Sequence, residues 1–571
     1  MFRSGSRSLS SPRPPNSVVG SANALVAEKR GSIICGFPLK TRRSSAASLH
    51  AGMTPRRAYE TASGKCEMFH LDLVLVNPAN DRKVSATSES FFRSLPAIEP
   101  PMWTALLAAF VREKGFTVQV VDAAAENLTA QETAKKVMEL NPVLIGIGVI
   151  GANPSASSTP KMPVASKLLH RLKDQQCAAK TFLYGIHPSA LPEMTLSEEP
   201  VDFLFRGECF YTTIEVLDCL KTGRGVGCSQ IPGLWYKNGE EIISGDWGIC
   251  IENIDELPLI AWDLLPMGKY RAHNWHCGYH DNNRKPYGVI YTSFGCPFTC
   301  KFCNISALYN GKAGIRYRSA KKVVDEIEIL VKDYGVKNIK IMDEMFALRE
   351  DRVSEICDLV IERQFDLNIW AYSRIDTAGN LELLKKMKKA GINWLAFGIE
   401  SGSKQVRNGM RKGKFDEERI KGTIKTVHDA GICVVGNFIF GLPGDDSQSM
   451  QNTFDLAKEL NCEHANFYTA MAYPGSNLYE EAVRNGWPLP VTWDGYSQYS
   501  EQAMPLATEN STSAEILRFR DETFENYFSG DRYMDMIKGK FGEEAVSHIR
   551  EMLKHKLKRR LLEKDCCHDH Q

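Results

Sequence analysis

Short apolar runs alternate with amphipathic segments along most of this 571-residue chain. In the first such series, the segments between the runs carry apolar side chains at helical spacing. Regular alternation of strand and helix favours a parallel sheet that is covered by helices on both faces. We therefore predict a doubly wound α/β domain with strands near residues 71–77, 116–121, 143–150, 181–184 and 203–205.

A second series of the same kind lies between about residues 285 and 475 and contains six strand-and-helix repeats. A closed barrel of this type needs eight repeats, so we expect an open, partial (β/α)6 barrel. In such a fold the chemistry gathers at the carboxyl ends of the strands. The expected strands lie near residues 288–293, 338–342, 368–372, 394–398, 433–440 and 465–470.

Three cysteines, Cys296, Cys300 and Cys303, follow the first strand of this second series with C-x3-C-x2-C spacing. Three thiolates from one short loop can hold three irons of a 4Fe–4S cube and leave the fourth iron open to a small molecule. A structural zinc site needs four ligands, usually from two C-x2-C pairs, and the sequence contains no second pair. The triplet therefore predicts an iron–sulfur cluster.

The cysteine motif and its flanks resemble the radical S-adenosylmethionine (SAM) superfamily. The resemblance continues through Ile341-Met-Asp-Glu-Met-Phe346, Phe397-Gly-Ile-Glu-Ser-Gly402 and Gly436-Asn-Phe-Ile-Phe-Gly-Leu-Pro-Gly444. Residues 67–225 resemble the cobalamin-binding domain that precedes the radical SAM core in one subgroup. The resemblance implies three cofactors: a 4Fe–4S cluster, SAM and cobalamin. One electron from the cluster would cleave SAM into methionine and a 5′-deoxyadenosyl radical.

The resemblance also implies roles for several strand-end residues. Asp343 and Glu344 would lie near the methionine part of SAM, Glu400 and Ser401 would face its ribose, and Asn437 would lie near adenine. The family more often has Gly-Gly-Glu where this chain has Met342-Asp-Glu. An acid at a strand end can instead cap the next helix. Arg374 could contact a carboxylate of the cofactor or form an internal ion pair.

We call the domain at residues 67–225 the front domain. Loops rich in small residues follow its strands, and in these loops the resemblance implies cobalamin-binding positions at Asn153, Ser155 and His187. Many cobalamin domains carry D-x-H-x-x-G after the first strand, but this chain reads Asn80-Asp-Arg-Lys83. We therefore expect cobalamin to bind without a histidine ligand from that position. His187 could ligate cobalt, but a loop histidine bonded to its neighbours is the simpler interpretation.

Cys277 stands in a run dense in titratable groups, His273-Asn-Trp-His-Cys-Gly-Tyr-His280. It could line the substrate pocket and donate a hydrogen atom, which makes it the candidate catalytic residue. The alternative is a loop with incidental histidines.

The remaining segments carry weaker signals. Residues 1–50 contain eight Lys or Arg, eleven Ser and one acid, which is typical of a transit peptide. We expect residues 1–66 to target a mitochondrion or plastid, or to be a disordered tail of a cytoplasmic protein. Residues 226–265 form a connector with a hairpin, 266–484 the radical SAM core, and 485–571 a mainly helical region with a helix at 543–562. The Cys566-Cys567-His568 tail could bind a metal.

Composition excludes some classes of function. The net charge of +1 gives no global field for nucleic acid, and no apolar run reaches the roughly 18 residues of a membrane helix. By resemblance we expect a cobalamin-dependent methyltransferase acting on an unactivated carbon of a small-molecule or lipid-like substrate, with flavodoxin or ferredoxin as electron donor. The alternatives are an oxidative cyclase or rearrangement enzyme with the same cofactors, or a non-catalytic cobalamin or iron–sulfur sensor.

Overall fold

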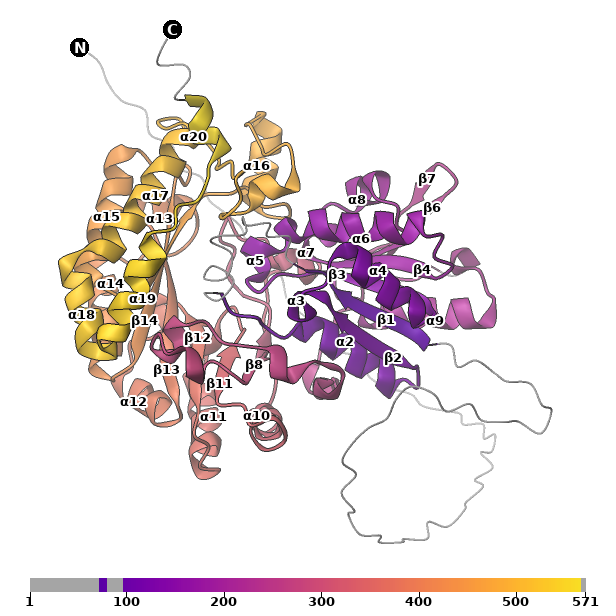
Figure 1. The fold of residues 1–571 in the computed structure, drawn as a ribbon, viewed down its shortest axis with the longest axis horizontal. Coiled ribbons are helices and arrows are strands. Elements are labelled where there is room, and N and C mark those ends of the chain that lie inside the picture. Colours follow the sequence, from indigo (N-terminus) through magenta and orange to yellow (C-terminus); the bar gives the residue numbers. More distant parts are fainter. Residues whose placement is uncertain (1–70, 80–95, 229, 566–571) are drawn as a thin grey trace, which may run out of the picture. The chain divides into compact units, whose positions relative to one another are not determined.

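The computed structural model describes residues 71–79, 96–228 and 230–565, all within one compact unit, Phe69–Gln571. Within this unit the chain forms two large sheets and a helical C-terminal region (Figure 1). The segments 1–66, Asn80-Asp-Arg-Lys83 and Cys566–His568, for which the sequence made predictions, lie outside the described residues.

The front sheet has seven strands in the order β2-β1-β3-β4-β5-β6-β7. The five strands expected from the sequence are parallel and adjacent, which confirms the doubly wound sheet. They are β1 (Leu71–Asn77), β2 (Val118–Asp122), β3 (Pro142–Val149), β4 (Lys180–Gly185) and β5 (Phe203–Phe205). The expected hairpin, β6 (Leu234–Asn238) and β7 (Glu241–Ile243), pairs antiparallel with β5 and so extends this sheet.

Alternating side chains of β1 explain why helices cover both faces of the front sheet (Figure 1). Leu73 and Leu75 belong to a core that includes α2 (Met102–Glu113) and α9 (Phe210–Thr222). Val74 and Val76 belong to a separate core with α4 (Ala130–Glu139) and α6 (Met162–Asp174). Successive residues of a strand point to opposite faces, so an uninterrupted apolar run fills both layers.

The second sheet has six parallel strands in the order β15-β14-β13-β12-β11-β8, as the sequence predicted for an open barrel. Its strands are β8 (Tyr287–Ile290), β11 (Asn338–Ile341), β12 (Asn368–Ser373), β13 (Ile392–Glu400), β14 (Cys433–Phe440) and β15 (His464–Thr469). The α-helices between these strands are α10 (Ala320–Tyr334), α11 (Glu350–Glu362), α12 (Leu381–Lys389), α13 (Lys404–Gly409), α14 (Glu417–Asp429) and α15 (Ser447–Leu460).

The inner face of the second sheet is more polar than its outer face. On β15, His464, Asn466 and Tyr468 alternate with the buried residues Ala465 and Phe467. Phe467 packs in the core beneath the helices, so the alternating polar side chains face the opposite side. This polar inner face leads to the carboxyl ends of the strands.

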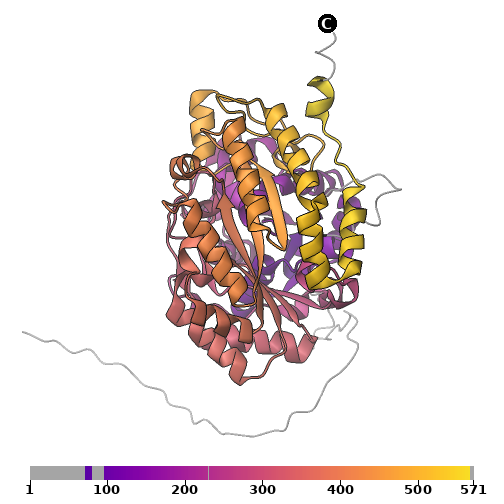
Figure 2. The ribbon, with the colours of Figure 1, turned by 90° about the vertical axis from the view of Figure 1, so that its left-hand side faces the viewer.

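The described part of the C-terminal region, up to residue 565, contains four α-helices, α17 (Ser513–Ser529), α18 (Asp531–Phe541), α19 (Glu543–Leu553) and α20 (Arg560–Asp565). Helix α17 packs on β15 (Figure 2). The continuous helix predicted at 543–562 is wrong, because α19 ends at Leu553. Buried Arg559 forms a bidentate pair with Asp521 and donates to the carbonyls of Gln498 and Ser500, which holds this segment out of a helix.

None of the helices in the described part of the chain is both long enough and apolar enough to span a membrane.

Candidate cluster and cofactor site

The three motif cysteines lie in one loop that follows β8, at the carboxyl end of the second sheet. A two-stranded ladder, β9 (Ser293–Phe294) with β10 (Arg316–Tyr317), closes the loop, and Gly314 N donates to the Cys296 carbonyl at 3.0 Å. All three cysteines are half-buried. Among the described residues no three His, Cys, Asp or Glu side chains converge on one metal ion. A 4Fe–4S cube does not need such convergence, because each thiolate binds a different iron.

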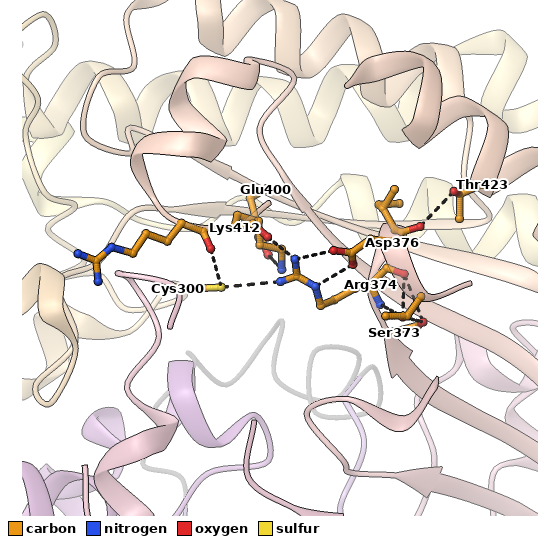
Figure 3. Close-up of polar contacts among 10 residues, drawn as sticks. Cys300, Ser373, Arg374, Asp376, Glu400, Lys412 and Thr423 are labelled. Carbon is orange, nitrogen blue, oxygen red and sulfur yellow. Dashed lines mark hydrogen bonds and ion pairs between the residues drawn. The ribbon is translucent and has the colours of Figure 1, made fainter. Parts of the chain in front are cut away.

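Arg374, directly after β12, points its guanidinium at the cysteine loop (Figure 3). Its Nη1 lies 3.9 Å from Cys300 Sγ, and its Cζ lies 3.8 Å from the centroid of the Phe298 ring. Its Nε and Nη2 donate to Asp376 at 2.9 and 3.0 Å. Of the two alternatives from the sequence, the structure shows the internal ion pair, and a contact with a carboxylate of the cofactor stays a prediction.

Glu400, at the end of β13, forms an ion pair with Lys412 at 2.7 Å, and both side chains are at most 10% exposed (Figure 3). Glu400 has a φ of +68° and lies at a register shift between β13 and β14. A left-handed conformation is costly for glutamate and is kept where surrounding structure enforces it. The sequence did not single out Lys412, which lies on a loop outside the Gly-Ile-Glu-Ser segment.

Glu344 is the one predicted carboxylate without a side-chain partner among the described residues. Both its oxygens are buried without a hydrogen bond of good geometry, and the backbone amides of Glu344 and Gly295 are the groups that lie near them. Burial raises the pKa of Glu344 to about 8, and the neighbouring Asp343 carboxylate adds to the shift. A buried, unsatisfied carboxyl group indicates a missing hydrogen-bond donor. Glu344 therefore has the geometry expected for contact with a bound amino group.

Asp343 differs from its neighbour because the protein occupies both of its oxygens. It accepts from Thr292 N at 2.6 Å and from Ser293 Oγ at 2.6 Å, at the start of the cysteine loop. Arg352 on α11 donates to the hydroxyl of Thr292 at 3.1 Å and completes the anchor. This geometry favours a role for Asp343 in anchoring the cysteine loop. The direct contact with SAM that the resemblance implied is less compatible with it.

Ser401 and Asn437 are likewise bonded within the protein. The Ser401 hydroxyl lies 3.2 Å from that of Thr453 and accepts from Ser403 N at 3.1 Å. Asn437 accepts from Asn466 Nδ2 at 2.9 Å and donates to the Phe397 carbonyl at 3.1 Å. Asn437 lies on a strand of the polar inner face, whereas Ser401 is fully buried in the loop directly after β13.

Two of the contacts between the front domain and the radical SAM core involve the loop after β3. Ser155 Oγ accepts from the backbone amide of Asn304, the residue after Cys303, at 3.4 Å. Lys340 of β11 donates to the Ala152 carbonyl at 2.8 Å. The same loop contains Asn153, which caps the short helix α5 (Pro154–Ser157). Ser155, which the sequence assigned to cobalamin, thus also contacts the cysteine loop.

His187 lies in the short helix α7 (Ile186–Ala190), directly after β4, and is 1% exposed. Its Nδ1 lies 3.2 Å from Thr159 Oγ1, and its ring meets the Trp493 ring edge-on at a centroid distance of 4.5 Å. Burial lowers the pKa of His187 to about 3, so the ring is neutral. These contacts match the simpler interpretation of His187 as a packed histidine.

Cys277 lies at the opposite end of the second sheet from the motif cysteines. Its Sγ is 3.4 Å from Asn338 Oδ1, and Asn338 is the first residue of β11. Together they line a cavity of about 740 Å³ among the amino ends of the strands. The expectation that Cys277 donates a hydrogen atom beside the cofactors is therefore wrong, because the sheet separates it from the cluster loop.

Known proteins share both halves of this arrangement. Residues 290–457 match the model of the Radical SAM superfamily, and residues 91–216 match that of the B12 binding domain. The chain is 33% identical over 412 residues to the uncharacterized methyltransferase PH0819 of Pyrococcus horikoshii, which covers 72% of this chain and 84% of that protein. This chain belongs to the cobalamin-binding radical SAM family.

Two further comparisons show how this radical SAM protein resembles its relatives. It is 28% identical over 389 residues to the anaerobic magnesium-protoporphyrin IX monomethyl ester cyclase of Rubrivivax gelatinosus, covering 67% of this chain and 66% of that enzyme. The structure of the methyltransferase TsrM from Kitasatospora setae, with cobalamin and a [4Fe-4S] cluster bound, has the same fold. That likeness has a TM-score of 0.59 at 15% identity and covers 85% of this chain and all of that one.

The protein is therefore a radical SAM enzyme whose cofactors are a 4Fe–4S cluster, SAM and cobalamin. The residues in the structure fit these groups. Three thiols in one loop suit the cluster, and the unsatisfied Glu344 suits the amino group of SAM. At the carboxyl edge of the front sheet, His187 is enclosed by its neighbours, which fits cobalamin held without this histidine as a ligand.

Proposed function

We propose that this enzyme transfers a methyl group from SAM to a carbon atom of a small-molecule substrate with the help of cobalamin. The observation that carries the proposal is the Ser155–Asn304 contact, which brings the front-domain loop against the cysteine loop. A methyl donor held at one loop and a radical source held at the other would then act on one substrate. The name of the Pyrococcus horikoshii relative, a methyltransferase, supports the same reaction.

When bound, the three cofactors supply the methyl carrier, the electron and the radical, and the protein supplies position and exclusion of water. Cys296, Cys300 and Cys303 bind the cluster. Glu344, whose pKa is about 8, binds an amino group most strongly when ionised, so SAM binding would draw it into the charged form. The polar inner face of the sheet, with Asn437 and Tyr468, would orient the substrate below the cofactors.

The test is the stoichiometry of SAM products. Reconstituted enzyme is incubated anaerobically with methyl-deuterated SAM, cobalamin, a low-potential reductant and pools of small metabolites. Mass spectrometry should find one labelled product, together with equal amounts of S-adenosylhomocysteine and 5′-deoxyadenosine. Equal amounts are expected because one SAM gives up its methyl group and a second SAM is cleaved to the radical.

An oxidative cyclase is the second candidate, favoured by the 28% identity to the Rubrivivax gelatinosus cyclase. The same experiment separates the two candidates. A cyclase would produce 5′-deoxyadenosine with no matching S-adenosylhomocysteine and no label in the product. That result would reject methyl transfer and retain radical SAM chemistry.

We also propose that flavodoxin or ferredoxin supplies the electron. The exposed residues Pro297 and Thr299 beside the cysteines give a donor access to the cluster loop.

For residues 1–66, the proposal of a transit peptide rests on composition alone. A reporter fused to this segment should enter a mitochondrion or plastid, and a cytosolic reporter would contradict the proposal.

A further inference from the structure

Arg374 is held in one orientation by contacts on several of its sides (Figure 3). Asp376 accepts from Nε and Nη2 in a bidentate pair, and the carbonyl of Lys412 accepts from Nη2 as well. One face of the guanidinium lies on Phe298, inside the cysteine loop. The side chain is only 5% exposed. Because these partners use Nε and Nη2, Nη1 is the nitrogen left to face Cys300.

The Nη1–Cys300 contact becomes stronger when the cysteine binds iron. In the metal-free chain, Cys300 Sγ also lies 3.8 Å from the Arg411 carbonyl, to which only a protonated thiol can donate. Metal binding removes the thiol proton, so the sulfur becomes solely an acceptor. The Arg374 N–H then points at a thiolate, and a hydrogen bond between charged groups is stronger than one between neutral groups.

We propose that Arg374 is a positioning residue that sets the reduction potential of the iron–sulfur cluster through a charge-assisted hydrogen bond to the Cys300 thiolate. One electron from a donor of the flavin or iron–sulfur class makes the cluster region more negative by one charge. A buried cation stabilises this reduced state more than the oxidised state, and hydrogen bonds to cluster sulfurs are known to shift potentials. Arg374 therefore makes reduction easier, while Asp376 fixes its direction. The proposal rests on the cluster and not on methyl transfer.

The experiment measures the midpoint potential of the cluster in anaerobically reconstituted full-length enzyme, by a redox titration followed with electron paramagnetic resonance. Arg374→Gln should retain about four irons per chain and shift the midpoint to a more negative value. Arg374→Lys keeps the charge but loses the planar fork, so its midpoint should lie between those of Arg374→Gln and the unchanged enzyme.

A matched control exists in the same radical SAM core. Arg349 and Asp351 form the same Arg-x-Asp bidentate pair at the start of α11, but their side chains are 54% and 67% exposed. Arg349→Gln removes an equal charge and an equal ion pair, and it should leave the midpoint unchanged. A comparable shift of the midpoint potential in Arg349→Gln would overturn the proposal, because the loss of any nearby cation would then be enough to shift the potential.

The proposal also fails if Arg374→Gln binds iron normally and titrates at the potential of the unchanged enzyme. If Arg374→Gln cannot assemble the cluster, Arg374→Lys decides between the outcomes. It keeps the positive charge near the loop and should titrate at a more negative midpoint, because the lysine ammonium group cannot be aligned by Asp376 as the planar guanidinium is. An unchanged midpoint in Arg374→Lys would then leave Arg374 with only a structural role and reject the proposal.

Discussion

The hydroxyl oxygen of Ser155 accepts a hydrogen bond from the backbone amide of Asn304, 149 residues later in the chain. Ser155 belongs to the loop after β3 of the front sheet, and Asn304 follows the last cysteine of the cluster loop. The two loops therefore share a direct contact.

Cluster assembly should depend on Cys300 and not on a buried cysteine elsewhere. Cys300→Ala should lose the cluster and SAM cleavage, because three thiolates are needed to hold the cube. Cys357 on α11 is fully buried in the apolar core, so Cys357→Ala should keep both and lose about 1 kcal/mol of stability. Iron analysis and detection of 5′-deoxyadenosine measure the outcome. Normal SAM cleavage by Cys300→Ala would refute the assignment.

Glu344 should destabilise the cofactor-free protein as the pH rises. Its pKa in the folded state is about 8, above the ordinary value of 4.5, mainly because of burial. The penalty is absent below pH 4.5, grows between pH 4.5 and 8, and is complete above pH 8. The free energy of unfolding of Glu344→Gln should therefore exceed that of the unchanged protein by about 1–3 kcal/mol at pH 8.5, and by little at pH 5. Urea unfolding at the two pH values measures this.

A control for Glu344 is a buried glutamate whose oxygens are occupied. Glu326 accepts from Ile260 N at 2.9 Å and from Arg318. Glu326→Gln should destabilise the protein at both pH values, since it breaks a buried ion pair. An equal gain in stability from both substitutions would show that the unsatisfied state of Glu344 is not the cause.

Loss of the Glu400 charge should strongly destabilise the protein. Glu400→Gln leaves the buried Lys412 cation without its partner, and breaking a buried pair costs about 3–5 kcal/mol. Asp429 pairs with Lys425 on the surface of α14, where both side chains are at least half exposed. Asp429→Asn should cost less than about 1 kcal/mol. Denaturant unfolding of both variants tests the contrast, and equal losses would argue against a tightly buried pair.

Cys277 should be dispensable for the reaction. Cys277→Ser keeps a donor toward Asn338 Oδ1 at the amino ends of the strands, far from the cysteine loop. We expect unchanged iron content and unchanged rates of 5′-deoxyadenosine formation in the presence of substrate. A variant that cleaves SAM but forms no product would restore Cys277 as a hydrogen donor.

His187 should not ligate cobalt. The ring is 1% exposed and packs on Trp493, so it cannot reach a cofactor without leaving its site. Electron paramagnetic resonance of the protein with Co(II) cobalamin should show no nitrogen splitting, and His187→Gln should give the same spectrum. A nitrogen-split signal that disappears in His187→Gln would make this histidine the lower ligand.

The sequence predicted both parallel sheets because their strands are apolar runs long enough to fill two layers, as β1 and β14 illustrate. It did not distinguish Asp343 from Glu344, since adjacent residues point in opposite directions and only the tertiary structure shows which one is bonded. Lys412 was missed because its pairing with Glu400 depends on the path of the chain after β13.

The sequence alone already argued against placing Cys277 beside the cofactors. Residues that precede a parallel strand lie at its amino end, and Cys277 comes ten positions before β8 begins at Tyr287. The chemistry of such folds gathers at the other end. The break after α19 had no such signal, because Arg559 leaves the helix only through partners from distant segments.

Lys340 of β11 lies inside the second sheet with its ammonium group against Glu99, at 2.9 Å, and both side chains are less than 7% exposed. Glu99 belongs to the segment that leads into α2 of the front domain. A replacement front domain that covered this lysine without supplying an acid would leave a buried ammonium group without its counter-charge, a cost of several kcal/mol. The front domain and the radical SAM core are therefore coupled through this ion pair. A chimera with a different front domain needs an acidic residue at the position of Glu99.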